Sequence, residues 1–563
     1  MLTCGEVLVR LLERLDVDTV FGIPGVHTVE LYRGLPATRI RHITPRHEQG
    51  AGFMADGYAR AGGKPGVCFI ITGPGMTNIM TAMGQAYGDS IPMLVISSVN
   101  KTEQLGMKGG RLHELPAQRE LTAGVTAFSH TLMRPDELPE VLSRAFALFA
   151  GARPRPVHIE IPIDVITAPA DHVSGRLGAR PGRPAPCPDA VARAAKALAG
   201  ARTPVLLLGG GTVDVGSRAA ALAEALDAPT AYTINAKGVM PKGHPLSLGS
   251  NQSWVPVREL TAAADVVLAI GTELGETDYD LVFDGNFRVT GTLIRIDIDP
   301  GQMHSNAPAD IGIVSDAGLA IDALLARLGD LGAARAADPA PREAQQTTAA
   351  TRPAAPGARP ATPGAQRAAA ARTRLDAQWS PAWRAQGRTL EIVQQTLPGV
   401  IIVGDSTQAV YSGNHLYEAE RPRAWFNSAT GYGTLGYGLP AAIGAKLAAP
   451  ERPVVALIGD GGIQFTLSEL ASAVEAGTPI IVLLWNNRGY GEIKRYMQER
   501  GIPTIGVDIY TPDFLTLARG FGCRAERATT FEQLERALEA AAAANVPTVI
   551  EVPEEGAFAG DPA

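Results

Sequence analysis

The stretch that decides the fold runs from Gly459 to Gly489 and reads GDGGIQFTLSELASAVEAGTPIIVLLWNNRG. An apolar strand over 454–458 enters the glycine turn. A helix-length spacer follows, and a second apolar strand over 479–485 enters the asparagine pair. Parallel strands joined by a helix have their C-terminal ends on one edge of a sheet. We therefore expect Asp460 and Asn487 to lie side by side, although they are distant in the sequence.

The residues at this edge have the chemistry of a metal and diphosphate site. The Asp460 carboxylate, the Asn487 side-chain amide and the Gly489 carbonyl offer the oxygen ligands that Mg²⁺ prefers, and phosphate oxygens usually complete such a shell. Backbone N–H groups of the glycine turn would face the same phosphates. A GDG turn alone is usually only a turn, whereas the joint pattern of strand, GDGG, spacer, strand and NN is far more specific.

Strand-like and helical patterns alternate along most of the chain, which predicts an α/β protein with doubly wound parallel sheets. At 563 residues the chain is too long for one core. We expect three such domains, over 1–167, 188–331 and 375–555. Residues 332–374 contain mainly Ala, Pro, Arg, Gln and Thr. This composition predicts a mostly disordered linker, because too little apolar surface can be buried to offset its ordering entropy.

Composition excludes several classes of function. A formal net charge of -7 over this length gives no reason to expect nucleic acid or an anionic membrane as a partner. The cysteines, Cys4, Cys68, Cys187 and Cys523, form no CxxC pair, which favours a reducing cytoplasm over a disulfide framework or a zinc site. The first residues lack the pattern of a secretion signal, and no apolar run approaches the length of a membrane span.

A second constellation is RHEQGAGFMADGYAR, over 46–60. Small residues follow Glu48 at helical spacing, which would allow another backbone or a flat ligand to pack very closely. A carboxylate at the start of this face could share a proton with a heterocycle. The alternative is an ordinary surface glutamate in a first helical turn, where the macrodipole favours it.

A third constellation is SATGYGTLGYGLP, over 428–440. Its glycines would let a flat ring lie directly on the backbone, with Leu435 as an apolar wedge. A glycine-rich segment for helix packing is the alternative, and the residues alone leave both open. Upstream, DSTQ over 405–408 follows another strand and offers hydroxyl and amide donors where phosphate could lie.

Together these motifs resemble those of the thiamine-diphosphate-dependent enzymes of the acetolactate synthase and pyruvate decarboxylase superfamily, over nearly the whole chain apart from 332–374. The resemblance implies pyrimidine-binding, central and diphosphate-binding domains, in chain order. It implies thiamine diphosphate and Mg²⁺ as cofactors. It also implies homodimers or homotetramers, in which the first domain of one subunit completes a site on the third domain of its neighbour.

The resemblance assigns roles to matching residues. Glu48 would hydrogen-bond the pyrimidine ring and activate the cofactor for attack on a 2-oxo acid, and Leu435 would hold the cofactor bent. The other implied contacts are Gly433 to the pyrimidine, Gln408, Gly461 and Gly462 to the diphosphate, and Asp460, Asn487 and the Gly489 carbonyl to the metal.

The sequence also departs from its best-known relatives. Pyruvate decarboxylases carry an acidic residue after the first Pro-Gly and two adjacent histidines, whereas here Val26 follows Gly25 and the later segment has only His113. His113 is therefore our candidate proton donor, with a solvated loop histidine as the alternative. FAD-binding synthases place an arginine after the glycine that ends a central strand. Here acidic residues follow Gly271, namely Glu273, Glu276, Asp278, Asp280 and Asp284. A negative stretch is a poor neighbour for an anionic dinucleotide, so we predict no functional FAD.

Three further segments, GIPGVHTVELYRGL, GRLHELPAQRELTAGV and TELGETDYDLVFDG, are most similar to those of bacterial 5-guanidino-2-oxopentanoate (2-ketoarginine) decarboxylases. That likeness implies release of CO₂ and 4-guanidinobutanal in arginine catabolism. A carboxylate is the natural partner of a guanidinium, and Glu114 and Glu492 are the candidates, unless both are ordinary surface acids. An acetolactate-synthase-like carboligase acting on pyruvate and a non-catalytic cofactor-binding homologue are the alternatives. Retention of Glu48, Asp460 and Asn487 argues against the latter.

Overall fold

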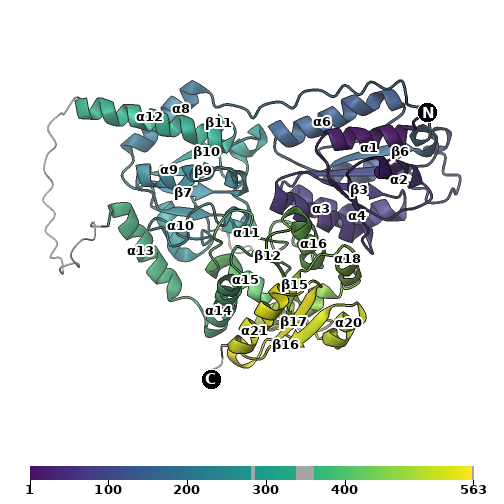
Figure 1. The fold of residues 1–563 in the computed structure, drawn as a ribbon. Coiled ribbons are helices and arrows are strands. Elements are labelled where there is room, and N and C mark those ends of the chain that lie inside the picture. Colours follow the sequence, from purple (N-terminus) through teal and green to yellow (C-terminus); the bar gives the residue numbers. More distant parts are fainter. Residues whose placement is uncertain (280–285, 338–360, 561–563) are drawn as a thin grey trace, which may run out of the picture. The chain divides into compact units, whose positions relative to one another are not determined.

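The computed structural model describes residues 1–279, 286–337 and 361–560, and these residues form three parallel β-sheets flanked by helices (Figure 1). The predicted α/β fold with parallel, helix-covered sheets is confirmed. The chain divides into two compact units. One contains the first and third sheets, over 1–183, 380–417 and 423–563, and the other contains the second sheet, over 184–379 with 418–422.

The first sheet has the strand order β2-β1-β3-β4-β6-β5, and every pair in it is parallel. Its strands are β1 (Thr19–Gly22), β2 (Arg41–Ile43), β3 (Gly66–Ile70), β4 (Met93–Val99), β5 (Phe128–Thr131) and β6 (Val157–Pro162). Its helices are α1 (Cys4–Arg14), α2 (Val29–Arg33), α3 (Glu48–Gly62), α4 (Pro74–Gly88), α5 (Gln118–Thr122), α6 (Leu138–Gly151) and α7 (Ile163–Ile166). The central strands are buried along their whole length, as expected when helices cover both faces of a parallel sheet.

The third sheet repeats this plan with the order β13-β12-β14-β15-β17-β16, again all parallel. Its strands are β12 (Ile401–Gly404), β13 (Trp425–Asn427), β14 (Val454–Gly459), β15 (Ile481–Asn486), β16 (Arg524–Arg527) and β17 (Thr548–Pro553). Its helices are α14 (Pro381–Thr396), α15 (Gln408–Leu416), α16 (Gly438–Ala448), α17 (Asp460–Ile463), α18 (Glu469–Glu475), α19 (Gly491–Glu499), α20 (Phe514–Gly520) and α21 (Phe531–Ala542).

Within this unit, α3 and α16 pack backbone against backbone. A Cβ atom on Gly57 would lie 2.0 Å from the carbonyl oxygen of Ala441, and one on Gly444 would lie 1.9 Å from that of Met54. The helices therefore require glycine at both positions. The small-residue face predicted for α3 receives another helix, and the apolar core on this side is continuous between the two sheets.

The second unit has a five-stranded parallel sheet of order β11-β10-β9-β7-β8. Its strands are β7 (Val205–Leu208), β8 (Thr230–Tyr232), β9 (Val266–Ile270), β10 (Thr292–Asp297) and β11 (Ile311–Val314). Its helices are α8 (Pro188–Gly200), α9 (Arg218–Leu226), α10 (Val255–Ala262), α11 (Glu276–Tyr279), α12 (Ala317–Ala337) and α13 (Pro363–Asp376).

The prediction of a disordered linker over 332–374 is wrong at both ends. Residues 332–337 complete α12, and residues 363–374 form most of α13. In α13, Ala368, Ala371 and Leu375 are buried, and the Gly364 N–H donates to an Asp227 carboxylate oxygen at 2.7 Å. Small residues, Gly364, Ala368 and Ala371, supply most of this buried face, which a count of large apolar residues overlooks. Residues 338–360, and the predicted acidic neighbours Asp280 and Asp284, lie outside the described residues.

Burial of Lys237 in the second unit makes stability depend on pH. Its side chain is 1% exposed, and desolvation lowers its pKa from 10.5 to about 7, although the Glu418 charge opposes that shift. The folded chain thus holds fewer protons than the unfolded chain between these values, so folding gains stability as pH rises through that window.

We compare the unfolding free energies of the wild type and of Lys237→Met. The wild-type value minus the variant value should increase between pH 7 and pH 10. Urea unfolding of both proteins, followed at each pH, measures this difference. A difference that stays flat or falls with pH would show that the amine is not desolvated.

Candidate active site

The end of β14 and the end of β15 bring Asp460 and Asn487 together as predicted. The strands pair in parallel with Gly459 opposite Trp485, and the Asn487 N–H donates to Asp460 Oδ1 at 3.3 Å. Asp460 is 1% exposed, and its Oδ2 is buried without a hydrogen-bond partner among the described residues. Burial raises the pKa of Asp460 from 3.8 to about 6, against backbone hydrogen bonds that lower it. A buried carboxylate oxygen with no protein partner is available to bind a cation.

The Gly489 backbone completes this edge. A Cβ atom there would lie 2.4 Å from the Val507 carbonyl oxygen, and the Tyr490 N–H donates to that oxygen at 2.9 Å. In the part of the chain that the structure describes, no group of three or more His, Cys, Asp or Glu side chains could hold a metal ion. A cation at this edge would therefore be held by one carboxylate together with amide and carbonyl oxygens. That set, completed by ligand oxygens, fits Mg²⁺.

Asp405, whose carboxylate the sequence analysis did not single out, ties the neighbouring segments to this edge. It follows β12 and is fully buried. Its Oδ1 accepts from the Ser406 N–H at 2.8 Å, and its Oδ2 accepts from the Gly438 N–H at 2.9 Å. The carboxylate thus links the end of β12 to the start of α16, where the glycine-rich loop ends.

The structure brings Gln408 and Glu492 together, although the sequence analysis gave them separate tasks. Gln408 begins α15, and its Nε2 donates to Glu492 Oε2 at 2.8 Å. Arg495, one turn further along α19, donates to Glu492 Oε1. Glu492 therefore already holds one guanidinium from its own helix.

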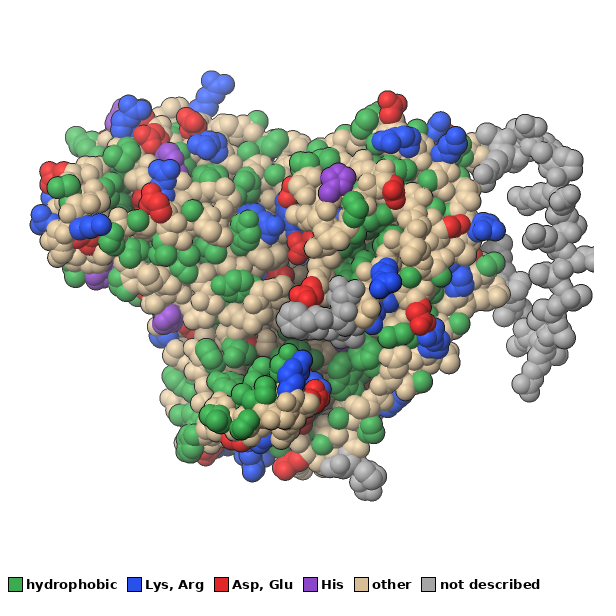
Figure 2. Space-filling model, turned by 180° about the vertical axis from the view of Figure 1, so that it is seen from behind, with side chains coloured by type: hydrophobic (Ala, Val, Ile, Leu, Met, Phe, Trp, Pro, Cys, Tyr) green, Lys and Arg blue, Asp and Glu red, His purple; other side chains and the backbone are tan. Residues whose placement is uncertain are grey.

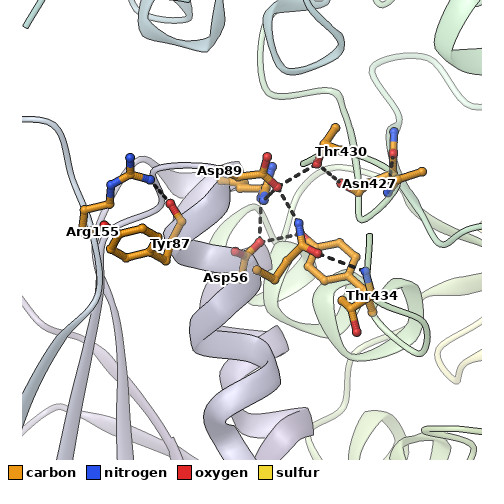
Figure 3. A network of polar contacts seen from close by, with 11 residues as sticks. Asp56, Tyr87, Asp89, Arg155, Asn427, Thr430 and Thr434 are labelled. Carbon is orange, nitrogen blue, oxygen red and sulfur yellow. Dashed lines mark hydrogen bonds and ion pairs between the residues drawn. The ribbon is translucent and has the colours of Figure 1, made fainter. Parts of the chain in front are cut away.

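The glycine-rich loop that carries Gly433 and Leu435 is anchored at both ends by a buried polar network (Figure 3). At one end Thr430 donates to Asp89 Oδ2 at 2.8 Å, and at the other Tyr437 donates to Asp56 Oδ1 at 2.5 Å. Between these anchors, residues 431–433 are exposed. The loop thus presents its backbone to solvent while its ends are fixed.

Arg60 joins the two carboxylates of this network. Its Nε donates to Asp56 and its Nη2 to Asp89, each at 2.6 Å, and all three side chains are at most 5% exposed. Gln85 donates to the same Asp89 oxygen at 2.6 Å and receives the Thr434 N–H at 3.4 Å. Helices α3 and α4 therefore determine the position of the loop. No local signal of this is present in the sequence, because the loop and its partners on the first sheet lie hundreds of residues apart.

Glu48 is the first residue of α3, and its Oε2 accepts from Asn78 Nδ2 at 2.9 Å. No hydrogen bond among the described residues joins it to Gly433, Asp460 or Asn487 of the same chain. Asn78 lies in the first half of α4, whereas the loop contacts Gln85, which is about 10 Å further along that helix at 1.5 Å per residue. The structure thus holds Glu48 and the glycine-rich loop on separate stretches of α4.

His113 lies beside a second histidine that the sequence analysis missed. The ring centroids of His27 and His113 are 5.3 Å apart. The Nδ1 atoms of both rings are buried without a partner among the described residues, and His27 is 8% exposed. Burial, and to a lesser extent the neighbouring His113, lower the pKa of His27. The His113 carbonyl accepts a hydrogen bond from the Thr72 hydroxyl at 3.3 Å, which places this pair at the turn that starts α4.

The Glu114 carboxylate accepts hydrogen bonds from the backbone N–H groups of Gly109 and Arg111, which lie in its own loop.

Comparisons with known proteins identify the family to which the chain is similar. Three models of the thiamine pyrophosphate enzyme family match the chain. The N-terminal TPP binding domain matches residues 2–121, the central domain matches 191–324, and the C-terminal TPP binding domain matches 405–552. The chain is 46% identical over 554 residues to the probable 2-ketoarginine decarboxylase AruI of Pseudomonas aeruginosa, covering 98% of this chain and 94% of that protein. It is 32% identical to the acetolactate synthase large subunit of Corynebacterium glutamicum, covering 96% and 84%. Benzoylformate decarboxylase from Polynucleobacter necessarius shares the fold, with a TM-score of 0.80, 24% identity and 98% coverage of both chains.

Replacing Asp460 tests the metal site. We expect Asp460→Asn to weaken Mg²⁺-dependent binding of thiamine diphosphate by about 100-fold or more, because even second-shell changes around metals cost 10- to 100-fold. Isothermal titration with the cofactor, with and without Mg²⁺, measures the effect. Equal affinity in both proteins would remove Asp460 from the metal shell.

A second variant tests the anchoring of the loop. Tyr437→Phe deletes one hydroxyl and leaves buried Asp56 with a weaker set of donors, so we expect a lower midpoint of thermal unfolding and a loss of stability of about 1–3 kcal/mol. We also expect weaker cofactor binding. Tyr58→Phe is the matched control, because Tyr58 lies on α3 and bonds Asp18 away from the loop. If both variants bind the cofactor with the same affinity, the network does not determine the position of the loop.

Proposed function

Because the chain belongs to the thiamine pyrophosphate enzyme family, we propose that it is a 2-oxo acid decarboxylase that uses thiamine diphosphate and Mg²⁺. The proposed reaction is non-oxidative and yields an aldehyde and CO₂. The substrate that we favour is 5-guanidino-2-oxopentanoate, which would give 4-guanidinobutanal in arginine catabolism. The observation that carries this choice is the 46% identity, over nearly both full lengths, to a probable 2-ketoarginine decarboxylase.

The partnerless oxygen of Asp460 supports the choice of cofactor and metal. We assign Asp460, Asn487 and the Gly489 carbonyl to Mg²⁺, and Gln408 with the N–H groups of Gly461 and Gly462 to the diphosphate. When bound, the cofactor supplies an electron sink for the bond that releases CO₂. The loop backbone at Gly433 and the Leu435 side chain would orient its pyrimidine ring and keep the cofactor bent.

Two groups of side chains would handle protons. The Glu48 carboxylate, oriented by Asn78, would hydrogen-bond the pyrimidine nitrogen. His113 and its neighbour His27, which retain buried nitrogens without partners, would give or take a proton at the substrate. The protein thus contributes orientation, a dry pocket and proton transfer.

Two features support a site shared between two copies of the chain. The separate stretches of α4 that hold Glu48 and the loop favour a Glu48 that serves the partner's cofactor. Figure 2 shows hydrophobic side chains gathered low in the view. In the domain of the third sheet, α19 has no buried residue, and Ile505 and Tyr510 are 77% and 84% exposed. Exposed apolar side chains of this kind favour burial against another protein surface.

None of the helices described is both long and apolar enough to cross a bilayer. A carboligase that joins two 2-oxo acids is the second candidate function. The 32% identity to an acetolactate synthase large subunit favours it.

A substrate panel tests the proposal. Purified protein with thiamine diphosphate and Mg²⁺ is given pyruvate, branched 2-oxo acids and 5-guanidino-2-oxopentanoate, and CO₂ and aldehyde are measured. We expect the highest kcat/KM with the guanidino acid. Acetolactate formed from pyruvate would establish the carboligase instead, and no turnover of any 2-oxo acid would refute both.

Glu492 and Glu499 form a matched pair for substrate recognition. Both lie on α19 and both bind Arg495, but only Glu492 also contacts Gln408. We expect Glu492→Gln to raise KM for the guanidino acid by about 10-fold, the value of a charge-assisted hydrogen bond, and to leave KM for branched 2-oxo acids unchanged. Glu499→Gln should leave both values unchanged. An equal rise for all substrates would show that Glu492 does not read the guanidinium.

A further inference from the structure

A buried carboxylate from the third sheet holds the backbone just before α3. Glu469 begins α18 and is 0% exposed. The Arg46 N–H lies 3.1 Å from each of its carboxylate oxygens, and the His47 N–H donates to Oε1 at 3.1 Å. Ser472 donates to Oε2 at 2.6 Å. The donors to this carboxylate are two backbone N–H groups and one serine hydroxyl. The two N–H groups belong to the segment that leads into α3.

The local sequence of α3 makes room for this contact. Glu48 comes directly after His47, and Gly50 follows two residues later. A Cβ atom on Gly50 would lie 2.2 Å from Glu469 Oε1. The absence of a side chain at Gly50 therefore lets the carboxylate reach the start of the helix, where free N–H groups and the helix dipole favour negative charge.

A second glutamate on the same helix shows what is particular to Glu469. Glu475 ends α18 and also pairs with Arg46, but through the arginine side chain, and its own side chain is 55% exposed. Such surface ion pairs contribute little. Glu469 instead holds backbone N–H groups in a buried setting, where hydrogen bonds to a charge are strong and set a geometry.

We propose that Glu469 is a positioning residue that fixes the segment before α3 and so sets where the Glu48 carboxylate meets the cofactor's pyrimidine ring. This inference rests on the role proposed for Glu48. Displacement of a reacting group by about 1 Å can cost 100-fold in rate. Holding the segment before Glu48 in place would therefore affect the rate directly. Burial raises the pKa of Glu469, with its hydrogen bonds opposing that shift. A carboxylate kept in so unfavourable a place is typical of a functional site.

The test measures activation of the cofactor without any substrate. Full-length protein is loaded with thiamine diphosphate and Mg²⁺ and diluted into D₂O. The exchange of the thiazolium C2 proton is then stopped with acid at set times and read by NMR. We expect Glu469→Gln to slow this exchange by about 10- to 100-fold, because a neutral amide with one acceptor oxygen holds the Arg46 and His47 N–H groups more weakly than a carboxylate does. Cofactor affinity, measured by titration, should stay at the wild-type value. Glu475→Gln is the matched control and should exchange at the wild-type rate.

Two further variants separate the possible outcomes. Glu48→Gln should abolish rapid exchange, and if it does not, the role of Glu48 fails and this inference fails with it. If Glu48→Gln is slow while Glu469→Gln matches the wild type, Glu469 does not position Glu48 and only this inference falls.

Glu469→Asp keeps the charge but is one methylene shorter, and it provides a second test if the Gln variant does not fold. We expect it to be slower than the wild type, and wild-type exchange in this variant would also overturn the inference.

Discussion

The close backbone contact between α3 and α16 is the constraint on which the rest of the first unit depends. Gly57 and Gly444 admit no side chain at the crossing, so the two helices lie nearer than side-chain packing would allow. Polar bonds also cross between the elements of the two sheets. The Tyr437 hydroxyl donates to Asp56, and the backbone N–H groups of Arg46 and His47 donate to Glu469. Apolar packing between the helices thus determines where the polar groups of the site lie.

Two buried carboxylates at the C-terminal edge of the third sheet, Asp405 and Asp460, differ in how their oxygens are satisfied. Burial raises the pKa of both Asp405 and Asp460 to about 6. Both Asp405 oxygens accept backbone N–H groups, so this side chain has completed its task within the protein. Asp460 leaves Oδ2 without a partner. An unmet buried acceptor costs about 1–3 kcal/mol, and a site that binds a cation recovers that cost when the ion is present.

The parts of this structure that follow from local sequence were predictable. Apolar runs before GDGG and NN gave β14 and β15, and parallel pairing then placed Asp460 next to Asn487. The failures have two physical origins. Helix α13 was missed because alanine can fill a shallow buried face without large side chains. Glu469, His27 and the Asp56–Tyr437 bond were missed because each acts on a segment far away in the sequence, and one sequence carries no local signal of such pairing.

The two histidines show how packing joins His113, which the sequence singled out, with His27, which it did not. His27 follows β1 and His113 lies in the loop after β4, so only the packing of the parallel sheet brings them to one edge. Burial, and to a lesser extent the neighbouring imidazole, lower the pKa of His27. A neutral imidazole carries one donor nitrogen and one acceptor nitrogen, so it can give or take a proton. Decarboxylation to an aldehyde needs both in turn, since a carbon must gain a proton and a hydroxyl must then lose one.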